Sequence, residues 1–452
     1  MSKRVVLTSL GICLLAAACE MPRPGNDVVQ QDATQDVNQQ DIVSQPDAMP
    51  EASPDVSEPE ASAPDASDAS ADAADAAMPI TCPPAATDFQ PRTSMASWMA
   101  PWNMCMAVTN PNAYPFFSMS ASAPVRVSRL GALEGPGRIF DPTRDPMPEE
   151  FVATSTDAGV NTSAEFLFRD TGVATRYQRR ADERYAAPMG LTLNSTYQDF
   201  CGTAANADAN VDYCAGPKAL NPVYNAALAA GMAGMSPTRV HAARLQASYQ
   251  WWLFISSYKE SLTCAPVSAD CDSAAGYYTG GANRDAAMQY GLARELLALG
   301  DAGRAAHDRI WDALLAVRCW RDMDGGRPSD GGTTTPATNE MLREQARTQL
   351  DRALTRGMVM IVQSRLRAFA STDGNPARAA ERQAHAAWIG VVGPLLANGL
   401  ERWSRGWWAS QRASAPMAVV TRVITELRAG EMITTTQAGR ASADLEGLFP
   451  CP

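Results

Sequence analysis

The sequence predicts a mainly α-helical protein, a disulfide-stapled antiparallel helical bundle with a loop-rich N-terminal cap. Two observations predict this fold class. Apolar residues recur every three or four positions along the long runs that follow residue 221, which is the period of a helix with one buried face. Eight cysteines follow residue 80, and an even number in a chain that begins with an export signal is typical of a disulfide framework.

Residues 1–18 have the composition of an export signal. Two basic residues precede an apolar run, 5–18, that ends at Cys19. As a helix, this run would span only ~21 Å, which is short of the ~30 Å hydrocarbon core of a bilayer. We therefore expect a cleaved signal peptide and not a transmembrane anchor. No later apolar run in the sequence is long enough to suggest one.

The cysteine at the end of the signal predicts lipid attachment at Cys19. Bacterial lipoboxes usually have Leu three residues before the cysteine, whereas this chain has Ala16 there and Leu15 one position earlier. The alternative is ordinary secretory cleavage after Ala18, which would leave an exposed thiol in an oxidising compartment. We favour lipidation, and with it a lipoprotein of the bacterial cell envelope, held at the outer membrane and facing the periplasm or the cell surface.

The excess of acidic residues lies in the segment that follows the predicted lipid-attachment site. The formal net charge is −11, but residues 20–80 hold 14 acidic residues and one basic residue, so the part after residue 80 is neutral. Because the segment 19–80 is rich in Asp, Ala, Ser and Pro and lacks aromatic residues, we expect a disordered acidic linker. The simplest role of this linker is to space the folded body from the lipid, and the alternative is docking of a basic partner. A neutral body gives no reason to expect a nucleic-acid partner.

The body divides by texture into two segments. Pro, Gly and Asn are frequent in 81–220, which predicts a loop-rich cap with short helices over 163–169 and 175–186. The segment 221–452 is predicted to be a helical domain. Its expected helices cover 236–262, 285–299, 302–320, 338–370, 375–403 with a kink or break near Gly390, Gly393 and Pro394, and 417–429.

Two disulfides are predicted from short spacings. Cys201–Cys214 would close a polar loop, and Cys264–Cys271 would close the loop after a predicted helix. The connectivity of the other four stays open: Cys82, Cys105, Cys319 and Cys451. No CxxC pair occurs in the sequence, so a zinc–thiolate site is not indicated.

A metal site is the sharpest chemical hypothesis. Glu381 and His385 are four residues apart on one predicted helix and so project from the same face, where they could share iron or zinc. The alternative is a solvated ion pair on the helix surface. Glu260 is the third candidate metal residue, although it lies at the far end of a different predicted helix.

Three further patterns have both a structural and a functional interpretation. The aromatic run Tyr249–Tyr258 is expected to be core, with a ligand-stacking surface as the alternative. Arg402–Trp408, RWSRGWW, is also expected to be core, and the alternative is an exposed binding patch or a membrane-facing aromatic cluster. Asp322 and Asp324 begin a loop similar to a calcium-binding loop, but Arg327 falls where an oxygen ligand is needed. The sequence has no GxSxG, no phosphate-binding Gly loop and no HExxH.

The stretch YKESLTC, followed by DCDSAAGYYTGGANRDAAMQYGLARELLAL, Cys319 and MVMIVQSRLRAFA, resembles the algal low-iron-inducible periplasmic proteins over about 237–430. These are secreted, cysteine-containing helical proteins associated with iron assimilation. The resemblance implies metal handling, and it assigns no ligand set to residues of this chain.

We therefore expect a non-enzymatic binding module of the cell envelope, with iron or another metal as the first ligand to test. Its partners would be the membrane, through the lipid, and a metal ion or an envelope protein. The alternative is a structural or interaction lipoprotein with no small-molecule site. A secreted hydrolase with a dispersed site comes third.

Overall fold

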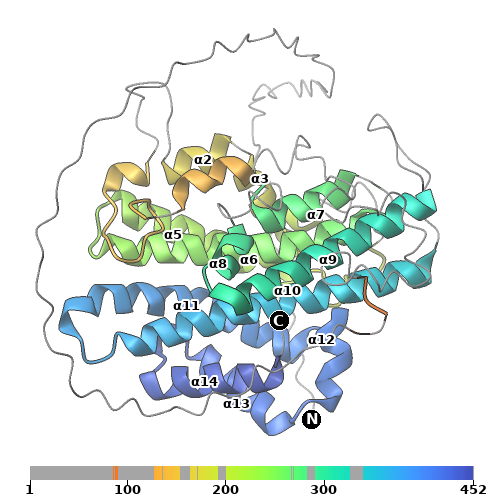
Figure 1. The fold of residues 1–452 in the computed structure, drawn as a ribbon. Helices are drawn as coiled ribbons and strands as arrows, with labels where there is room; N and C mark the ends of the chain where they lie inside the picture. The colour runs from red at the N-terminus through yellow and green to blue at the C-terminus, as the bar shows by residue number, and fades with distance from the viewer. Residues whose placement is uncertain are drawn as a thin grey trace, which may run out of the picture. The chain divides into compact units, whose positions relative to one another are not determined.

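The computed structural model describes residues 85, 87–89, 127–134, 136–152, 163–170, 172–191, 200–265, 267, 269–281, 291–325 and 339–450. Every regular element in these ranges is a helix (Figure 1), which confirms the predicted mainly α fold. The described residues belong to one compact unit. No helix among them is both long and apolar enough to cross a membrane. The predicted signal, Cys19 and the whole acidic linker lie outside the described residues, as does the loop after Gly325.

Short helices and connecting segments form the part before residue 221, in agreement with its Pro- and Gly-rich texture. The elements are η3 (Arg129–Leu133), η4 (Pro148–Glu150), α2 (Ala164–Asp170), α3 (Val173–Tyr177), α4 (Ala204–Ala209) and the π-helical turn η6 (Gly216–Leu220). The helix expected over 175–186 is wrong in extent, because α3 ends at Tyr177 and the chain continues without helix through residue 188.

Longer helices follow and form the bundle. They are α5 (Asn221–Met232), α6 (Thr238–Thr263), α7 (Ala269–Thr279), α8 (Gly291–Leu297), α9 (Gly300–Gly325), α10 (Glu340–Ser371), α11 (Ala379–Arg402), α12 (Gly406–Gln411), α13 (Met417–Arg428) and α14 (Thr435–Leu448). Helix α10 packs on α9, α11 and α14, and α6 packs on α5, α7 and α11 (Figure 1). Four of these helices, α5, α7, α12 and α14, were not among those expected from the sequence.

Helix α6 is the centre of the core. Nearly all of its side chains from His241 to Thr263 are buried, including Trp251 and Trp252. A helix that is buried on all sides must be covered by neighbours, here α5, α7, α10 and α11. The aromatic run is therefore core, as expected. The three tryptophans of RWSRGWW are core as well, because Trp403, Trp407 and Trp408 are all buried.

Helix α11 is continuous from Ala379 to Arg402, so of the kink or break expected near Pro394, the break is wrong. Its glycines instead allow close packing. A Cβ atom on Gly393 would lie 2.8 Å from the backbone oxygen of Leu427, and one on Gly390 would meet the side chain of Glu431. These glycines let α13 and the turn after it approach the α11 backbone, a tertiary role that the sequence alone does not reveal.

Helix starts follow local capping chemistry in two cases. The Asn339 side chain accepts a hydrogen bond from the Leu342 amide at the start of α10. Thr434 and Gln437 form a reciprocal capping box at the start of α14. Helix α6 begins at Thr238 with Pro237 in the N-cap position, where no side chain forms a capping hydrogen bond.

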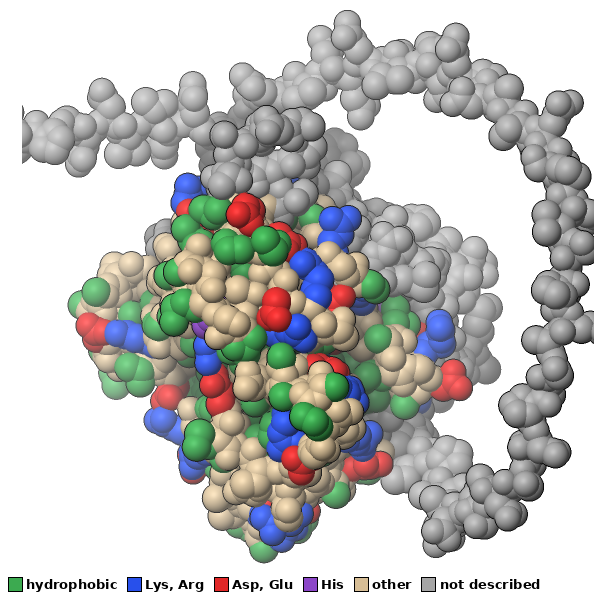
Figure 2. All heavy atoms as spheres, turned by 90° about the vertical axis from the view of Figure 1, so that its left-hand side faces the viewer, with side chains coloured by type: hydrophobic (Ala, Val, Ile, Leu, Met, Phe, Trp, Pro, Cys, Tyr) green, Lys and Arg blue, Asp and Glu red, His purple; other side chains and the backbone are tan. Residues whose placement is uncertain are grey.

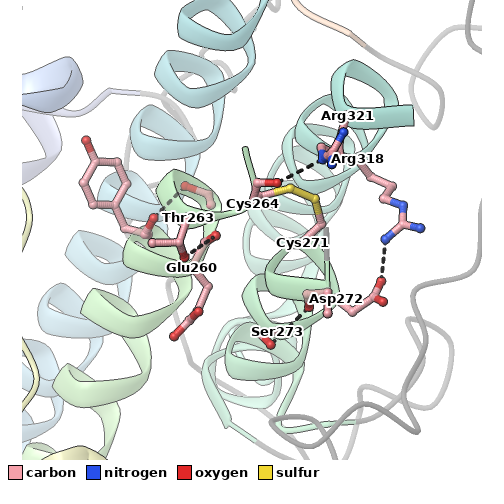
Figure 3. The surroundings of a disulfide bond; sticks show 11 residues. Glu260, Thr263, Cys264, Cys271, Asp272, Ser273, Arg318 and Arg321 are labelled. Atoms are coloured by element: carbon pink, nitrogen blue, oxygen red, sulfur yellow. Dashed lines mark hydrogen bonds and ion pairs between the residues drawn. A yellow bond between two sulfur atoms is a disulfide. The ribbon is translucent and has the colours of Figure 1, made fainter. Parts of the chain in front are cut away.

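Both predicted disulfides are present. The Cα atoms of Cys201 and Cys214 lie 5.3 Å apart, and those of Cys264 and Cys271 lie 5.0 Å apart. The second bond joins the end of α6 to the first turn of α7 (Figure 3). Cys319 is disulfide-bonded as well.

Two arginines of α9 support this junction. Arg321 donates from Nε to the backbone oxygen of Cys264 over 3.1 Å, and Arg318 forms a 2.8 Å ion pair with Asp272 of α7 (Figure 3). The disulfide therefore lies within a junction of three helices that is also held by buried polar contacts.

Candidate binding pocket

A polar pocket lies where the chain after α3 meets the C-terminal end of α6. Its empty space, including the part open to solvent, is about 410 Å³. The Cys201–Cys214 disulfide holds one wall, since Cys201 lines the pocket. The lining residues are Arg176, Arg179, Arg180, Ala181, Glu183, Phe200, Cys201, Lys259 and Glu260. We call this the Arg180 pocket.

Basic side chains outnumber acidic ones in this lining. Three arginines, 176, 179 and 180, and Lys259 face only Glu183 and Glu260. With all six groups ionised, the lining would carry an excess of two positive charges. On the surface face shown in Figure 2, by contrast, the described basic and acidic side chains are interspersed.

Glu260 is held between two cations at the base of this group. Arg180 donates to its Oε1 over 3.0 Å and Lys259 to its Oε2 over 3.2 Å, and all three side chains are buried. Burial alone would raise the pKa of Glu260, but the charges of Lys259 and Arg180 outweigh burial and lower the pKa. Glu260 therefore stays ionised and fixes the two cations in place.

Two aromatic rings contact the Arg180 guanidinium. Its guanidinium lies 5.9 Å from the ring centre of Trp252 and 5.3 Å from that of Tyr277, and it donates to the Tyr277 hydroxyl over 3.3 Å. Its buried Nε has no hydrogen-bond partner within the described part of the chain. The side chain is thus rigidly placed and still has an unused donor.

Glu183 is the titratable group of the pocket. Burial raises its pKa to about 7, against the hydrogen bond of 2.9 Å that the Tyr213 hydroxyl donates to its Oε1. Its Oε2 is buried and finds no partner in the described ranges. A carboxyl group with a pKa near neutrality beside a pocket is a recognised mark of a functional site.

Asp270 is a second carboxyl with a shifted pKa behind the pocket. It lies in the first turn of α7, and burial, followed by the charge of Glu260, raises its pKa to about 7. Asp270 does not line the pocket, but its charge interacts with those of Glu260 and Lys259, which do line it.

Glu381 and His385 lie together, at a different place from Glu260. His385 Nε2 is 3.6 Å from Glu381 Oε1, and Arg378 holds the same carboxylate through hydrogen bonds of 2.6 and 2.8 Å. Burial lowers the pKa of His385 to about 4, so its imidazole is neutral. Its buried Nδ1 has no hydrogen-bond partner among the described side chains and backbone groups.

The structure does not bring Glu260 to this pair. His385 lines a pocket with Ala242 and Gln246 near the start of α6, whereas Glu260 lies at the other end of that helix. The 14 residues from Gln246 to Glu260 correspond to about 21 Å along the helix axis. Within the described ranges, no group of three or more His, Cys, Asp or Glu side chains is placed to hold a metal ion.

Sequence reasoning missed Arg180, Glu183 and Lys259. Arg180 and Glu183 lie in the charged stretch RYQRRADERY, which suggested a short helix and gave no sign that two of its charges would line a pocket. Lys259 gave the better signal, because it occurs within a helix whose neighbouring residues predicted core. A lysine in such a position is seldom buried without an acidic partner.

Comparison of the chain with protein-family models, with curated protein sequences and with solved structures finds no match.

Proposed function

We propose that this protein is a lipoprotein of the bacterial cell envelope whose helical body is a non-enzymatic binding module, with the Arg180 pocket as its binding site. The signal and Cys19 support attachment to the outer membrane, and the acidic linker supports spacing of the body from it. The burial of charge around the pocket carries the binding role.

Burying these charged side chains costs free energy. Arg180, Glu183, Lys259 and Glu260 are all buried, and burying charges is unfavourable unless every one of them is paired. Here Arg180 Nε and Glu183 Oε2 have no partners among the described atoms, and both residues line the pocket. Unused buried donors and acceptors also occur elsewhere in the described part of the chain, for example on Arg184, but these two belong to residues that line a pocket, where a ligand can reach them.

The test is a thermal-shift screen of the full mature chain, purified in detergent, against cationic, neutral and anionic small molecules. We expect at least one class to raise the melting temperature, and Arg179→Gln to reduce that gain. Arg422→Gln, which changes an exposed arginine on α13, is the matched control and should keep the gain. If no class stabilises the protein, a structural or interaction lipoprotein is the better description.

A metal ion is the second candidate ligand, at Glu381 and His385. The neutral His385 imidazole offers its unused Nδ1 to iron or zinc, while Nε2 on the other side of the ring faces Glu381. The resemblance to algal low-iron-inducible periplasmic proteins supports the same role. Metal analysis of the purified protein tests it. We expect bound iron or zinc that His385→Ala removes, and a metal content unchanged by that substitution would refute this site.

A further inference from the structure

We propose that the Arg180 pocket binds a small oxyanion, a carboxylate or phosphate-like group, and that protonation of Glu183 strengthens this binding. This inference rests on the proposed function, since it names the ligand class of the same pocket. It uses three features: the excess of basic groups, the unused donor of Arg180, and the position of Glu183.

The pocket wall offers the donors that oxyanions require. Arg176 and Arg179 are only partly buried and line the pocket beside fully buried Arg180. Guanidinium groups present paired N–H donors that match the oxygens of carboxylate and phosphate. Glu260 pairs with both Arg180 and Lys259, and Arg176 and Arg179 add two further basic groups to the same lining.

A cation or a neutral ligand fits this wall less well. A cation would have to approach at least three arginines while the best acidic partner, Glu260, is occupied on both oxygens. A neutral ligand would leave the positive excess uncompensated. An anion instead pairs with groups that are positioned in advance by Trp252, Tyr277 and Glu260.

Glu183 makes this binding depend on pH. The charged and polar groups that act on it come from each neighbouring segment: Tyr213 by its hydrogen bond, Asp182, Lys259 of α6, and Arg405 before α12. Burial raises its pKa to about 7, so that Glu183 is neutral in mildly acidic solution and ionised in mildly basic solution. An ionised Glu183 places a negative charge on the pocket wall and repels a bound anion.

Asp270 ionises in the same pH range, because its pKa is also raised to about 7. Its charge acts on Lys259 from behind the pocket and therefore works in the same direction, but it does not line the site. Substitution of each acid separately distinguishes the two contributions.

The experiment is isothermal titration calorimetry of the full mature chain in detergent, at constant ionic strength. Sulfate, which does not titrate between pH 6 and pH 8.5, is the phosphate-like probe, and malonate is the carboxylate probe. We expect one of them to bind, and sulfate to bind about tenfold more tightly at pH 6 than at pH 8.5 if it is the preferred probe. If malonate is preferred, the same ratio is measured with malonate between pH 7 and pH 8.5, above its own titration, and should be about fivefold.

Three variants sharpen the result. Arg179→Gln should weaken binding at least tenfold, and Arg422→Gln on α13 should leave it unchanged. Glu183→Gln should lose most of the pH dependence and bind at pH 8.5 with close to its low-pH affinity, whereas Asp270→Asn should retain most of the pH dependence. If Glu183→Gln does not fold, the pH ratio of the unchanged protein still tests the proposal.

The outcomes separate this inference from the proposed function. Binding of neither probe, together with a cationic or neutral ligand whose stabilisation is lost in Arg179→Gln, would overturn the oxyanion proposal and leave the binding module standing. Binding of neither probe and of no other ligand overturns both. Anion binding with equal affinity at both pH values refutes the role of Glu183.

Discussion

At the scale of single residues, the segment Arg180–Arg184 places several charges inside the protein. Arg184 is fully buried, donates to Asp351 over 2.6 Å, and lies 4.1 Å from the ring centre of Tyr258. Trp403 donates to Asp182 over 3.1 Å. These contacts connect the chain after α3 to α6, α10 and the segment before α12. Burial without partners would be strongly unfavourable, so these pairs determine where the segment lies.

Glu134 gives a residue-scale prediction that is independent of the pocket. It is buried, accepts a hydrogen bond from the Gly291 amide over 3.0 Å, and has a pKa that burial, followed by the charge of Glu295, raises to about 8. The folded protein therefore keeps a proton that the unfolded chain has lost above about pH 4.5. The stability contributed by the neutral carboxyl is complete below pH 4.5 and is lost as the pH rises through 8.

We expect the free energy of unfolding to fall between pH 6.5 and pH 8.5, and Glu134→Gln to remove about 2 kcal/mol of that fall. Denaturant titrations at the two pH values measure it. His385 does not interfere, because its pKa is lowered to about 4 and its effect on stability is confined to pH values below about 6.5. The exposed Glu149→Gln is the control, and an equal pH slope in both variants would contradict the assignment.

At the scale of elements, close approach between helices decides what the glycines do. Gly393 lies on α11 against the α13 backbone, whereas Gly439 lies on the exposed side of α14 with open space around its Cα atom. Both residues are helical, so their intrinsic helix propensities are alike and only their neighbours differ.

Gly393→Ala should lower the free energy of unfolding by about 1–3 kcal/mol, because α11 and α13 must separate to admit the methyl group. Gly439→Ala should instead raise it by up to about 1 kcal/mol through helix propensity. Chemical denaturation of the two variants gives both values. Equal effects would mean that the close contact with Leu427 does not constrain the bundle.

At the scale of the whole molecule, the lipid and the linker determine where the body works. Cys19→Ala should move the protein from the membrane fraction to the soluble fraction and abolish globomycin-sensitive processing. Cys13→Ala, within the predicted signal, is the matched control and should change neither. Membrane association that survives Cys19→Ala would show that attachment does not depend on this thiol.

The sequence by itself determined the helical class, the approximate extent of α6, α9, α10 and α13, and the two local disulfides. These depend on short-range properties, since apolar periodicity and cysteine spacing are properties of neighbouring residues. It also predicted that the tryptophans of RWSRGWW lie in the core, where the structure places them.

Only the tertiary structure decided the rest. Arg180 and Arg184 of RYQRRADERY are buried because acidic and aromatic partners from α6, α7 and α10 surround them. Glu260 pairs with Arg180 and Lys259 and lies at the opposite end of α6 from the residues that line a pocket with His385. Likewise, the close packing of α13 on α11 depends on glycines of α11 whose neighbours lie about 35 residues further along the chain. Each of these outcomes depends on residues far apart in the chain, and local sequence patterns contain no information about which distant side chains will meet.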